Sequence, residues 1–523
     1  MSLLDDVSIV VTPNGYKAGE LYAVIPSNGD ADMDVTRATD ATRVDENGLV
    51  NYAEVIGGEE VTCGDFSCAV PTDYWTENGW TINGEASNDG VNTGNLNQDI
   101  GLQQDKTYLV EVTITNYNSG TLQVRLGLGA TIDVGSSEDT FSLTLTSTST
   151  NSLLRFYPKV GSLFNGSISN VSVKEVTRDN VPRIDYTGGG CPHILAEPQR
   201  TNLITYSEDF SQWNNARTTD TSNQATSPDG TNNATYLEQN TGETNAGSIF
   251  APVTVIATDY SFSIFAKKKE KDFIVAYDTN ANRTYFNISN GTLGNNGSGG
   301  TSKIEDYGNG WYRCSVSYTE SSAASTNIAW YLGDTNGSTT VTDSGGVYIY
   351  GCQLEAGSYA TSYIPTSGST VTRNQDIFTR DGIGSLIGSE GVLFIEMAAL
   401  SNDLTNRVIS LNDGTSSNRL MLYLNSLSNT IAVVITSGGS TINYAVSDET
   451  SFNKMAVRYR DNDLTLWVDG QSRGTPITSA TIPTFTALKF DSGGGSSPFF
   501  GKVKQLQVYD TALTDTQLAA LTS

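Results

Sequence analysis

The sequence predicts an all-β protein of tandem antiparallel β-sandwiches, of jelly-roll or lectin-like type, with a small additional region at the N-terminus. Glycine is abundant, with 51 residues, and only 17% of the residues are charged. That balance favours short strands joined by turns over helices. Because 523 residues are too many for one hydrophobic core, we expect three or four domains.

Apolar residues recur at every second position, as in TYLVEVTITNY (107–117), YSFSIFAK (260–267) and LTLWVDG (464–470). This period of two is typical of strands that bury one face. Turn dipeptides separate such segments, namely Asn47-Gly48, Asn78-Gly79, Asn290-Gly291, Asn309-Gly310 and Asp469-Gly470. One helix is expected, near the C-terminus, where Thr514-Asp515-Thr516-Gln517 has the form of a capping box before LAAL.

Two segments share one layout. Residues 66–176 and 206–357 each open with tryptophan beside acidic and amide residues, and each closes on a strand that ends in glutamate, Glu175 or Glu355. We interpret them as a duplication. A third sandwich is predicted over 385–523, preceded by a linker at 373–384 (RNQDIFTRDGIG).

The formal net charge of −27 excludes some classes of partner. Such a surface repels phosphate backbones, so we expect no nucleic-acid partner, and it disfavours approach to an anionic membrane. No run of about 18 apolar residues occurs, so no membrane insertion is expected.

The five cysteines are expected to be made in a reducing compartment, because MSLLDDVSIVV has two acidic and no basic residues, unlike a secretory signal. The CGDFSC spacing of Cys63 and Cys68 fits neither a zinc ribbon nor a redox CxxC motif. Cys314 and Cys352 lie in strand-like segments. We expect free thiols, and leave open whether Cys63 forms a disulfide with Cys68 or Cys314 forms one with Cys352.

Two parts of the chain resemble known families. MAVRYRDNDLTLWVDGQ, followed by KQLQVYDTALTDTQLAAL, resembles the concanavalin A-like or laminin-G-like sandwich. YSEDFSQW, GNGWYRCSVSY and QLEAGSYATSYIPT resemble the carbohydrate-binding-module-like jelly rolls of bacteriophage fibre and tail proteins. TRATDATRVDENGLV (36–50) and residues 180–210 resemble the two halves of one short phage module, which usually follow each other closely.

The resemblance implies a domain layout. The separation of the two half-modules suggests that a jelly roll is inserted into a surface hairpin, where insertions are best tolerated. The expected parts are a virion-attachment region at 1–56 completed by 179–205, the inserted carbohydrate-binding-like jelly roll at 57–178, a second at 206–372, and a concanavalin A-like domain at 385–523.

The single histidine, His193, stands two positions after Cys191 and behind three glycines. On an extended segment the two side chains would point to the same side, as a nucleophilic dyad requires. However, Pro192 lies between them and no residue nearby is an obvious orienting group, so we expect a structural seam. The chain also lacks the E-x-D-x-x-E strand of sandwich glycosidases, so no enzyme and no catalytic residue is expected.

Aromatic residues are the better candidates for a binding site, because the apolar faces of sugar rings stack on aromatic side chains. Tyr74, Trp75 and Trp80 surround a predicted turn, and Trp330 with Tyr331 lies in NIAWYLGD. We predict that these five bind carbohydrate. For the tryptophans, plugging the sandwich core is the competing interpretation.

The resemblance implies a phage virion structural protein, a fibre, spike or decoration subunit that adheres reversibly to host surface glycans. It would be made in the host cytoplasm, bind other virion proteins through its N-terminal region, and act as a homotrimer whose weak sites add up by avidity. The alternatives are a capsid- or tail-stabilising protein that binds only virion proteins and, less favoured, a polysaccharide depolymerase; a head or tail location is left open. Structural Ca²⁺ is the one cofactor that the jelly-roll resemblance suggests, with residues 207–210 and Asp343 as candidate ligands.

Overall fold

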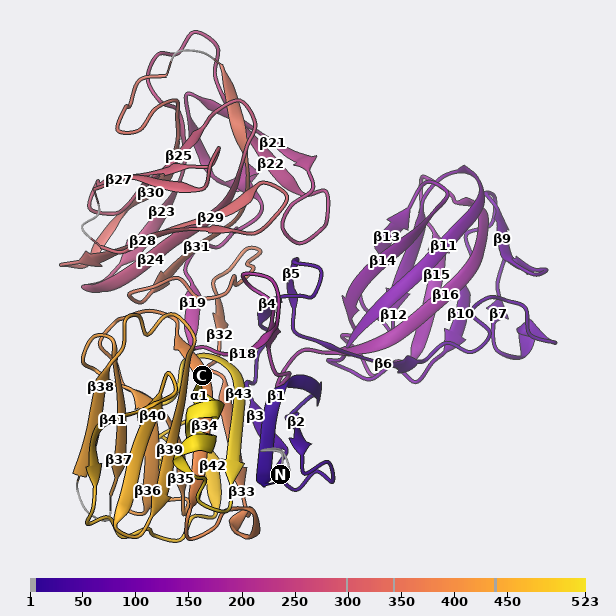
Figure 1. The fold of residues 1–523 in the computed structure, drawn as a ribbon. Coiled ribbons are helices and arrows are strands. Elements are labelled where there is room, and N and C mark those ends of the chain that lie inside the picture. The colour runs from indigo at the N-terminus through magenta and orange to yellow at the C-terminus, as the bar shows by residue number, and fades with distance from the viewer. Residues whose placement is uncertain (1–5, 298–299, 342–343, 437–439) are drawn as a thin grey trace. The chain divides into compact units, whose positions relative to one another are not determined.

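The structure, a computed structural model, describes residues 6–523 except 298–299, 342–343 and 437–439. The chain forms two compact units, Glu54–Arg178 and the remainder, Met1–Ala53 with Asp179–Ser523. The fold is all-β, as predicted, and the described residues contain one α-helix, α1 (Asp515–Thr522), which lies near the C-terminus in Figure 1. None of the helices in this part of the chain has the length and apolar character needed to cross a bilayer.

The unit Glu54–Arg178 is a sandwich of two antiparallel sheets. Its strands are β6 (Val55–Glu59), β7 (Thr76–Glu77), β8 (Thr81–Ile82), β9 (Ala86–Asp89), β10 (Leu96–Asp99), β11 (Thr107–Ser119), β12 (Leu122–Leu126), β13 (Ile132–Gly135), β14 (Asp139–Thr146), β15 (Leu153–Pro158) and β16 (Asn165–Thr177). One sheet has the order β13-β12-β15-β10-β7 and the other β14-β11-β16-β9-β8, with β6 beside β16. The alternation in β11 buries Tyr108, Val110, Val112 and Ile114 in the core between the sheets.

A second sandwich lies in the other unit. Its strands are β20 (Asn214–Ala216), β21 (Thr218–Ala225), β22 (Ala234–Gln239), β23 (Ser248–Val255), β24 (Thr258–Lys268), β25 (Phe273–Tyr277), β26 (Arg283–Asn287), β27 (Thr292–Asn296), β28 (Ser302–Asp306), β29 (Trp311–Glu320), β30 (Ala324–Gly333) and β31 (Gly345–Ala356). The sheet orders are β20-β23-β30-β25-β26-β27 and β21-β22-β31-β24-β29-β28. Apart from β6 in the first sandwich and the added β27 and β28 in the second, the two sets of orders match strand for strand.

The C-terminal sandwich is one 16-stranded sheet that folds back on itself. Its elements are β1 (Val7–Lys17), β2 (Glu20–Ile25), β3 (Met33–Thr36), β17 (Ile184–Asp185), β18 (His193–Ala196), β33 (Ile377–Asp381), β34 (Gly391–Ala399), β35 (Arg407–Asn412), β36 (Arg419–Leu424), β37 (Thr430–Ile435), β38 (Ser440–Ala445), β39 (Asn453–Arg460), β40 (Asp463–Val468), β41 (Gln471–Ile477), β42 (Ala487–Lys489), β43 (Gly501–Tyr509) and the helix α1 (Asp515–Thr522). Leu422 and Val433 from one half of the strand order share a core with Ile395 and Val457 from the other.

N-terminal strands are built into this sheet. β1 pairs with β43, and β3 pairs with β33, which lies in the segment predicted to be a linker. Ile9 and Val11 are buried in the C-terminal core, because an apolar strand must find a partner sheet. The prediction of a linker at 373–384 is therefore wrong: β33 is an integral strand of the sheet. Two short ladders complete the unit, β4 (Thr42–Val44) with β5 (Val50–Tyr52) and β19 (Arg200–Asn202) with β32 (Val371–Arg373).

Five charged side chains form a buried ion network in this unit. Asp376 accepts hydrogen bonds from Arg37, at 2.9 Å, and from Arg183. Glu197 accepts a hydrogen bond from Arg183 at 2.6 Å and lies 2.8 Å from the guanidinium of Arg373. All five side chains are almost completely buried. The network joins segments that lie up to 339 residues apart in the chain.

The predicted turns and helix cap are present. The five glycines of the turn dipeptides have positive φ, as do Asn309 and Asp469, which gives two hairpins of the type that a right-handed strand twist prefers. Thr514 and Gln517 exchange the two hydrogen bonds of a capping box at the start of α1.

One pair of cysteines, Cys63 and Cys68, is not a pair of free thiols, which was the expectation. Cys63 and Cys68 form a disulfide, because the turn between them brings their Cα atoms within 5.8 Å, inside the range that a disulfide spans. Cys314 and Cys352 are free and buried, as expected.

Candidate functional site

The candidate site lies on the outer face of the sheet β20-β23-β30-β25-β26-β27. In β30 successive side chains point to opposite faces, so Trp330 and Tyr331 separate. Trp330 is completely buried in the sandwich core, with its ring 4.6 Å from that of Phe262. Tyr331 is half-buried and faces outward, where it packs beside Val275 and Tyr285 from the next two strands.

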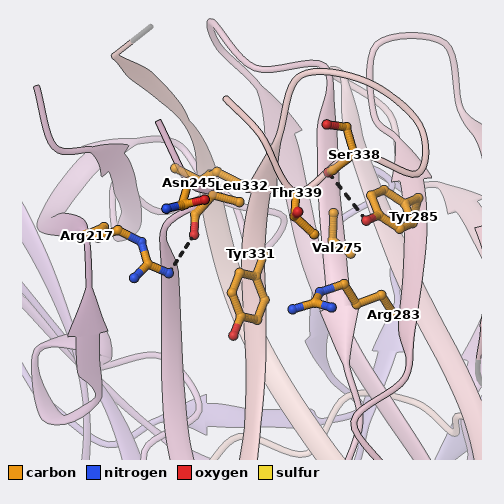
Figure 2. Close-up of a pocket in the computed structure, with 10 residues that line it drawn as sticks. Arg217, Asn245, Val275, Arg283, Tyr285, Tyr331, Leu332, Ser338 and Thr339 are labelled. Carbon is orange, nitrogen blue, oxygen red and sulfur yellow. Dashed lines mark hydrogen bonds between the residues drawn. The ribbon is translucent and has the colours of Figure 1, made fainter. Parts of the chain in front are cut away.

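A pocket of about 280 Å³ opens over this outward face (Figure 2). This volume is close to the lower end of the range for small-molecule sites, which suits one sugar residue better than an extended chain. Apart from Ala246 and Leu332 the lining is polar, aromatic or β-branched; the residues are Arg217, Asn245, Ala246, Val275, Arg283, Tyr285, Tyr331, Leu332, Ser338 and Thr339. Among the described residues that line it there is no aspartate, glutamate, histidine or cysteine, so these ten residues offer no carboxylate or imidazole for general acid–base chemistry.

Two paired segments form the walls of the pocket. Ala246 donates its backbone N–H to the carbonyl of Thr339 at 2.9 Å, and Val341 donates to the carbonyl of Thr244 at 3.0 Å. The buried Gln239 holds the first segment from behind: its amide nitrogen donates to the carbonyl of Asn245 at 2.9 Å, and its amide oxygen accepts from the N–H of Gly247 at 2.8 Å. A satisfied buried amide of this kind fixes the wall in one position.

Gly247 must be glycine. A Cβ at this position would lie 2.6 Å from the carbonyl oxygen of Arg217, which is closer than real Cβ contacts. The missing side chain therefore allows the wall to approach the backbone that carries Arg217.

Two arginines supply the charge of the pocket. The Arg283 guanidinium carbon lies 5.4 Å from the centre of the Tyr331 ring and 5.2 Å from that of Tyr277, within cation–π range. Arg217 donates to the carbonyl of Ala246 at 3.1 Å. Figure 2 shows the two guanidinium groups on either side of Tyr331. Neither arginine has an ion pair with any residue that the structure describes.

The predicted tryptophans occupy cores. Trp75 and Trp80 are 1% and 5% exposed, and their indole N–H groups donate to the carbonyls of Cys63 and Gly94. With Trp330 they have no free face on which a sugar can stack, so core packing is the role that the structure gives them. Tyr74 is 48% exposed, and Tyr331 lines the pocket.

The arginines and the two walls were not among the predicted site residues. Arg217 and Arg283 are 66 positions apart in the sequence and share no motif. The alternation of NIAWYLGD was the one usable signal, because it requires that one of two adjacent aromatic residues point outward.

His193 is the first residue of β18, which pairs with β17. It is 2% exposed, its Nε2 is 3.4 Å from an oxygen of Asp185, and Cys191 is exposed. The expectation that His193 and Cys191 point to the same side is therefore wrong, since one side chain is buried and the other is in solvent. The expectation that no orienting group lies near His193 is also wrong, because the β17–β18 ladder places Asp185 opposite His193.

Of the predicted calcium ligands, the acidic residues that the structure describes have protein hydrogen-bond partners. Both Tyr350 and Tyr363 donate their hydroxyls to the half-buried Glu208 carboxylate, at 3.1 and 3.0 Å, and Asp209 caps the short turn at Ser211. Asp343 lies outside the described residues. In the described part of the chain no three His, Cys, Asp or Glu side chains gather as metal ligands would.

Fold and pocket together define the class: a protein of several β-sandwiches with a polar pocket on the outer face of one sheet. Residues 394–519 match the laminin-G family profile described as the concanavalin A-like lectin/glucanases superfamily. The C-terminal domain is thus concanavalin A-like and laminin-G-like, as the sequence resemblance implied.

Two solved structures are similar to parts of the chain. The Ruminococcus gnavus IT-sialidase CBM40 bound to alpha2,3 sialyllactose has 18% identity over 26% of this chain and 84% of its own, with a TM-score of 0.23. Domains LG4-5 of the mouse laminin alpha1 chain have 14% identity over 52% of this chain and 92% of their own, with a TM-score of 0.19. No curated protein matches the sequence.

Proposed function

We propose that this chain is an adhesion protein that displays lectin-like sandwiches and binds surface glycans reversibly through the pocket at Tyr331. The observation that carries the proposal is the composition of that pocket: an outward tyrosine ring, two guanidinium groups, and the amide and hydroxyls of Asn245, Ser338 and Thr339. A tyrosine face matches the apolar face of a pyranose, and the polar groups match its hydroxyls. The lectin-type C-terminal domain supports the same role.

We further propose that the adhesin is a structural subunit of a phage particle, a fibre, spike or decoration protein, and that it acts as a homotrimer. The resemblance of residues 36–50 and 180–210 to a phage module supports this role. The disulfide between Cys63 and Cys68 is compatible with display outside the cell. Strand β1 pairs with β43, and the buried ion network links Arg37 to Asp376, so segments from both ends of the chain are fixed together, which suits a rigid display element.

The glycan-binding role predicts that Tyr331→Ala weakens binding of the full chain to host surface glycans by at least about fivefold, because a tyrosine anchor in a pocket typically contributes more than about 1 kcal/mol. Binding is measured on a glycan array and confirmed with immobilised host surface polysaccharide. Tyr157→Ala is the matched control, since Tyr157 is a half-buried outward tyrosine on β15, the strand that corresponds to β30. A wild-type chain that binds no glycan contradicts the adhesion role, and cleavage of the polysaccharide would indicate a depolymerase instead.

The virion role predicts that gold-labelled antibodies against the chain decorate intact phage particles at a fixed position on the head or tail. The label should be lost when particles are assembled without the chain. If the particles carry no label but the isolated protein still binds glycans, the virion role is overturned and the adhesion role stands.

A further inference from the structure

The charge of the pocket is opposite to that of the chain. The sequence has 57 acidic and 30 basic residues, yet the ten lining residues include two arginines and no acid. At physiological ionic strength the screening length is about 8 Å, so distant carboxylates contribute little inside the pocket. A ligand group that enters it is therefore exposed mainly to the two guanidinium groups.

Arg283 is held in place without being neutralised. Its Nε atom is buried and has no hydrogen-bond acceptor in the described residues, while the rings of Tyr277 and Tyr331 support the guanidinium. A partly buried cation without an acceptor retains an unmet requirement for one. A carboxylate satisfies this requirement well, because its two oxygens match the fork of donors on a guanidinium.

This arrangement is not a necessary result of the fold. The corresponding row in the other sandwich runs through Tyr157, Gln123 and Asp133. There an acid is already present, and Asp133 is paired with Lys159 at 2.5 Å and accepts from Gln123 at 2.7 Å. The row that holds Tyr331, Val275 and Tyr285 at the pocket therefore holds a paired acid in the other sandwich.

We propose that the pocket recognises an acidic sugar, a pyranose that carries a carboxylate. This inference rests on the proposed glycan-binding function and narrows its ligand class. Arg283 binds the carboxylate, Arg217 adds a second positive charge, and the Tyr331 ring supports the apolar face of the sugar. Asn245, Ser338 and Thr339 are the partners available for its hydroxyls.

The test measures binding of two acidic probes to the full chain by calorimetry: tetragalacturonic acid, as a hexuronate, and N-acetylneuraminic acid, as a nonulosonate. Each probe is compared with its methyl ester, which keeps the shape and removes the charge. We expect at least one acid to bind tenfold or more tightly than its ester, and the probe that does so identifies the source of the carboxylate. Arg283→Gln should remove this preference, and Arg217→Gln should reduce it.

Two further variants make the result specific. Arg283→Lys keeps the charge but loses the fork of donors, so it should retain only part of the preference. Arg473→Gln is the control, because Arg473 also lies over a tyrosine ring, that of Tyr444, at 4.9 Å, but outside the pocket. Equal binding of acid and ester, or binding of neutral glycans alone, overturns the inference and leaves glycan adhesion standing. A chain that binds neither these probes nor any neutral glycan overturns the proposed function itself.

Discussion

Replacement of Asp376 by asparagine is expected to lower the free energy of unfolding of its unit by about 3–5 kcal/mol, the range for removal of one partner from a buried ion pair. Asp376 is fully buried and receives hydrogen bonds from Arg37, from Arg183 and from the backbone N–H of Glu197. Asparagine keeps the shape of the side chain but removes its charge. Arg37 and Arg183 would then remain in the interior without the carboxylate that they share.

The measurement is urea- or heat-induced unfolding of the full chain, with the transition of this unit compared between variants. Asp463→Asn is the matched control, because Asp463 also pairs with two arginines, Arg458 at 3.2 Å and Arg460 at 2.8 Å, but its side chain is 20% exposed and Arg460 is 49% exposed. Ion pairs that solvent reaches contribute less than buried ones, typically about 1 kcal/mol or less at the surface. If Asp376→Asn costs no more than Asp463→Asn, the network does not stabilise the unit.

Strands were predictable from the sequence because their signal is local. The alternation of residues 107–117, 260–267 and 464–470 became β11, β24 and β40. Thr514 and Gln517 likewise stand within one helical turn of each other, so the capping box was visible in the sequence. Local patterns of this kind need no knowledge of the partner strand.

The joints between sandwiches were not predictable, because their partners are distant. Arg373 and Asp376 resemble solvated charges of a linker in the sequence, and only the fold brings Arg183 and Glu197 to them. The apolar β1 has the sequence of an ordinary strand, but nothing local indicates that it pairs with β43 at the other end of the chain.

The candidate site was predictable only in part for the same reason. The sequence places two aromatic residues at 330 and 331, and alternation requires that they face opposite ways. Which of them faces outward depends on the second sheet that covers Trp330. The arginines come from β26 and from the turn before β21, so their meeting at Tyr331 is a property of the folded sheet.

His193 is expected to titrate far below the ordinary histidine range, near pH 4. Burial lowers its pKa to about 4, since a charged imidazole would lose its hydration; Asp185 opposes this shift, and Lys502 and Lys504 add to it. As the chain has one histidine, selective labelling gives a single imidazole signal, and its chemical shift can be followed by NMR without assignment. A midpoint near 6.5 would show that the ring is open to solvent.

The same shift sets the pH dependence of stability. Between pH 6.5 and 4 the unfolded chain binds a proton on histidine that the folded chain does not, so the free energy of unfolding falls as the pH falls. The full stability is present above pH 6.5, and the loss reaches about 3 kcal/mol near pH 4 at 1.36 kcal/mol per pH unit.

Glu197 contributes to the pH dependence only at lower pH. Burial alone would raise the pKa of Glu197, but Arg373 and Arg183 outweigh burial and hold that pKa well below its usual value. The stability that ionised Glu197 provides is therefore lost only below about pH 4.5. Glu208 and Glu449, whose pKa values burial raises, titrate in both chains, so the difference between the wild-type and His193→Gln profiles reports the histidine. From pH 6.5 to 4.5 the wild-type chain should lose roughly 2–3 kcal/mol relative to His193→Gln, and parallel profiles for the two chains would contradict the buried neutral imidazole.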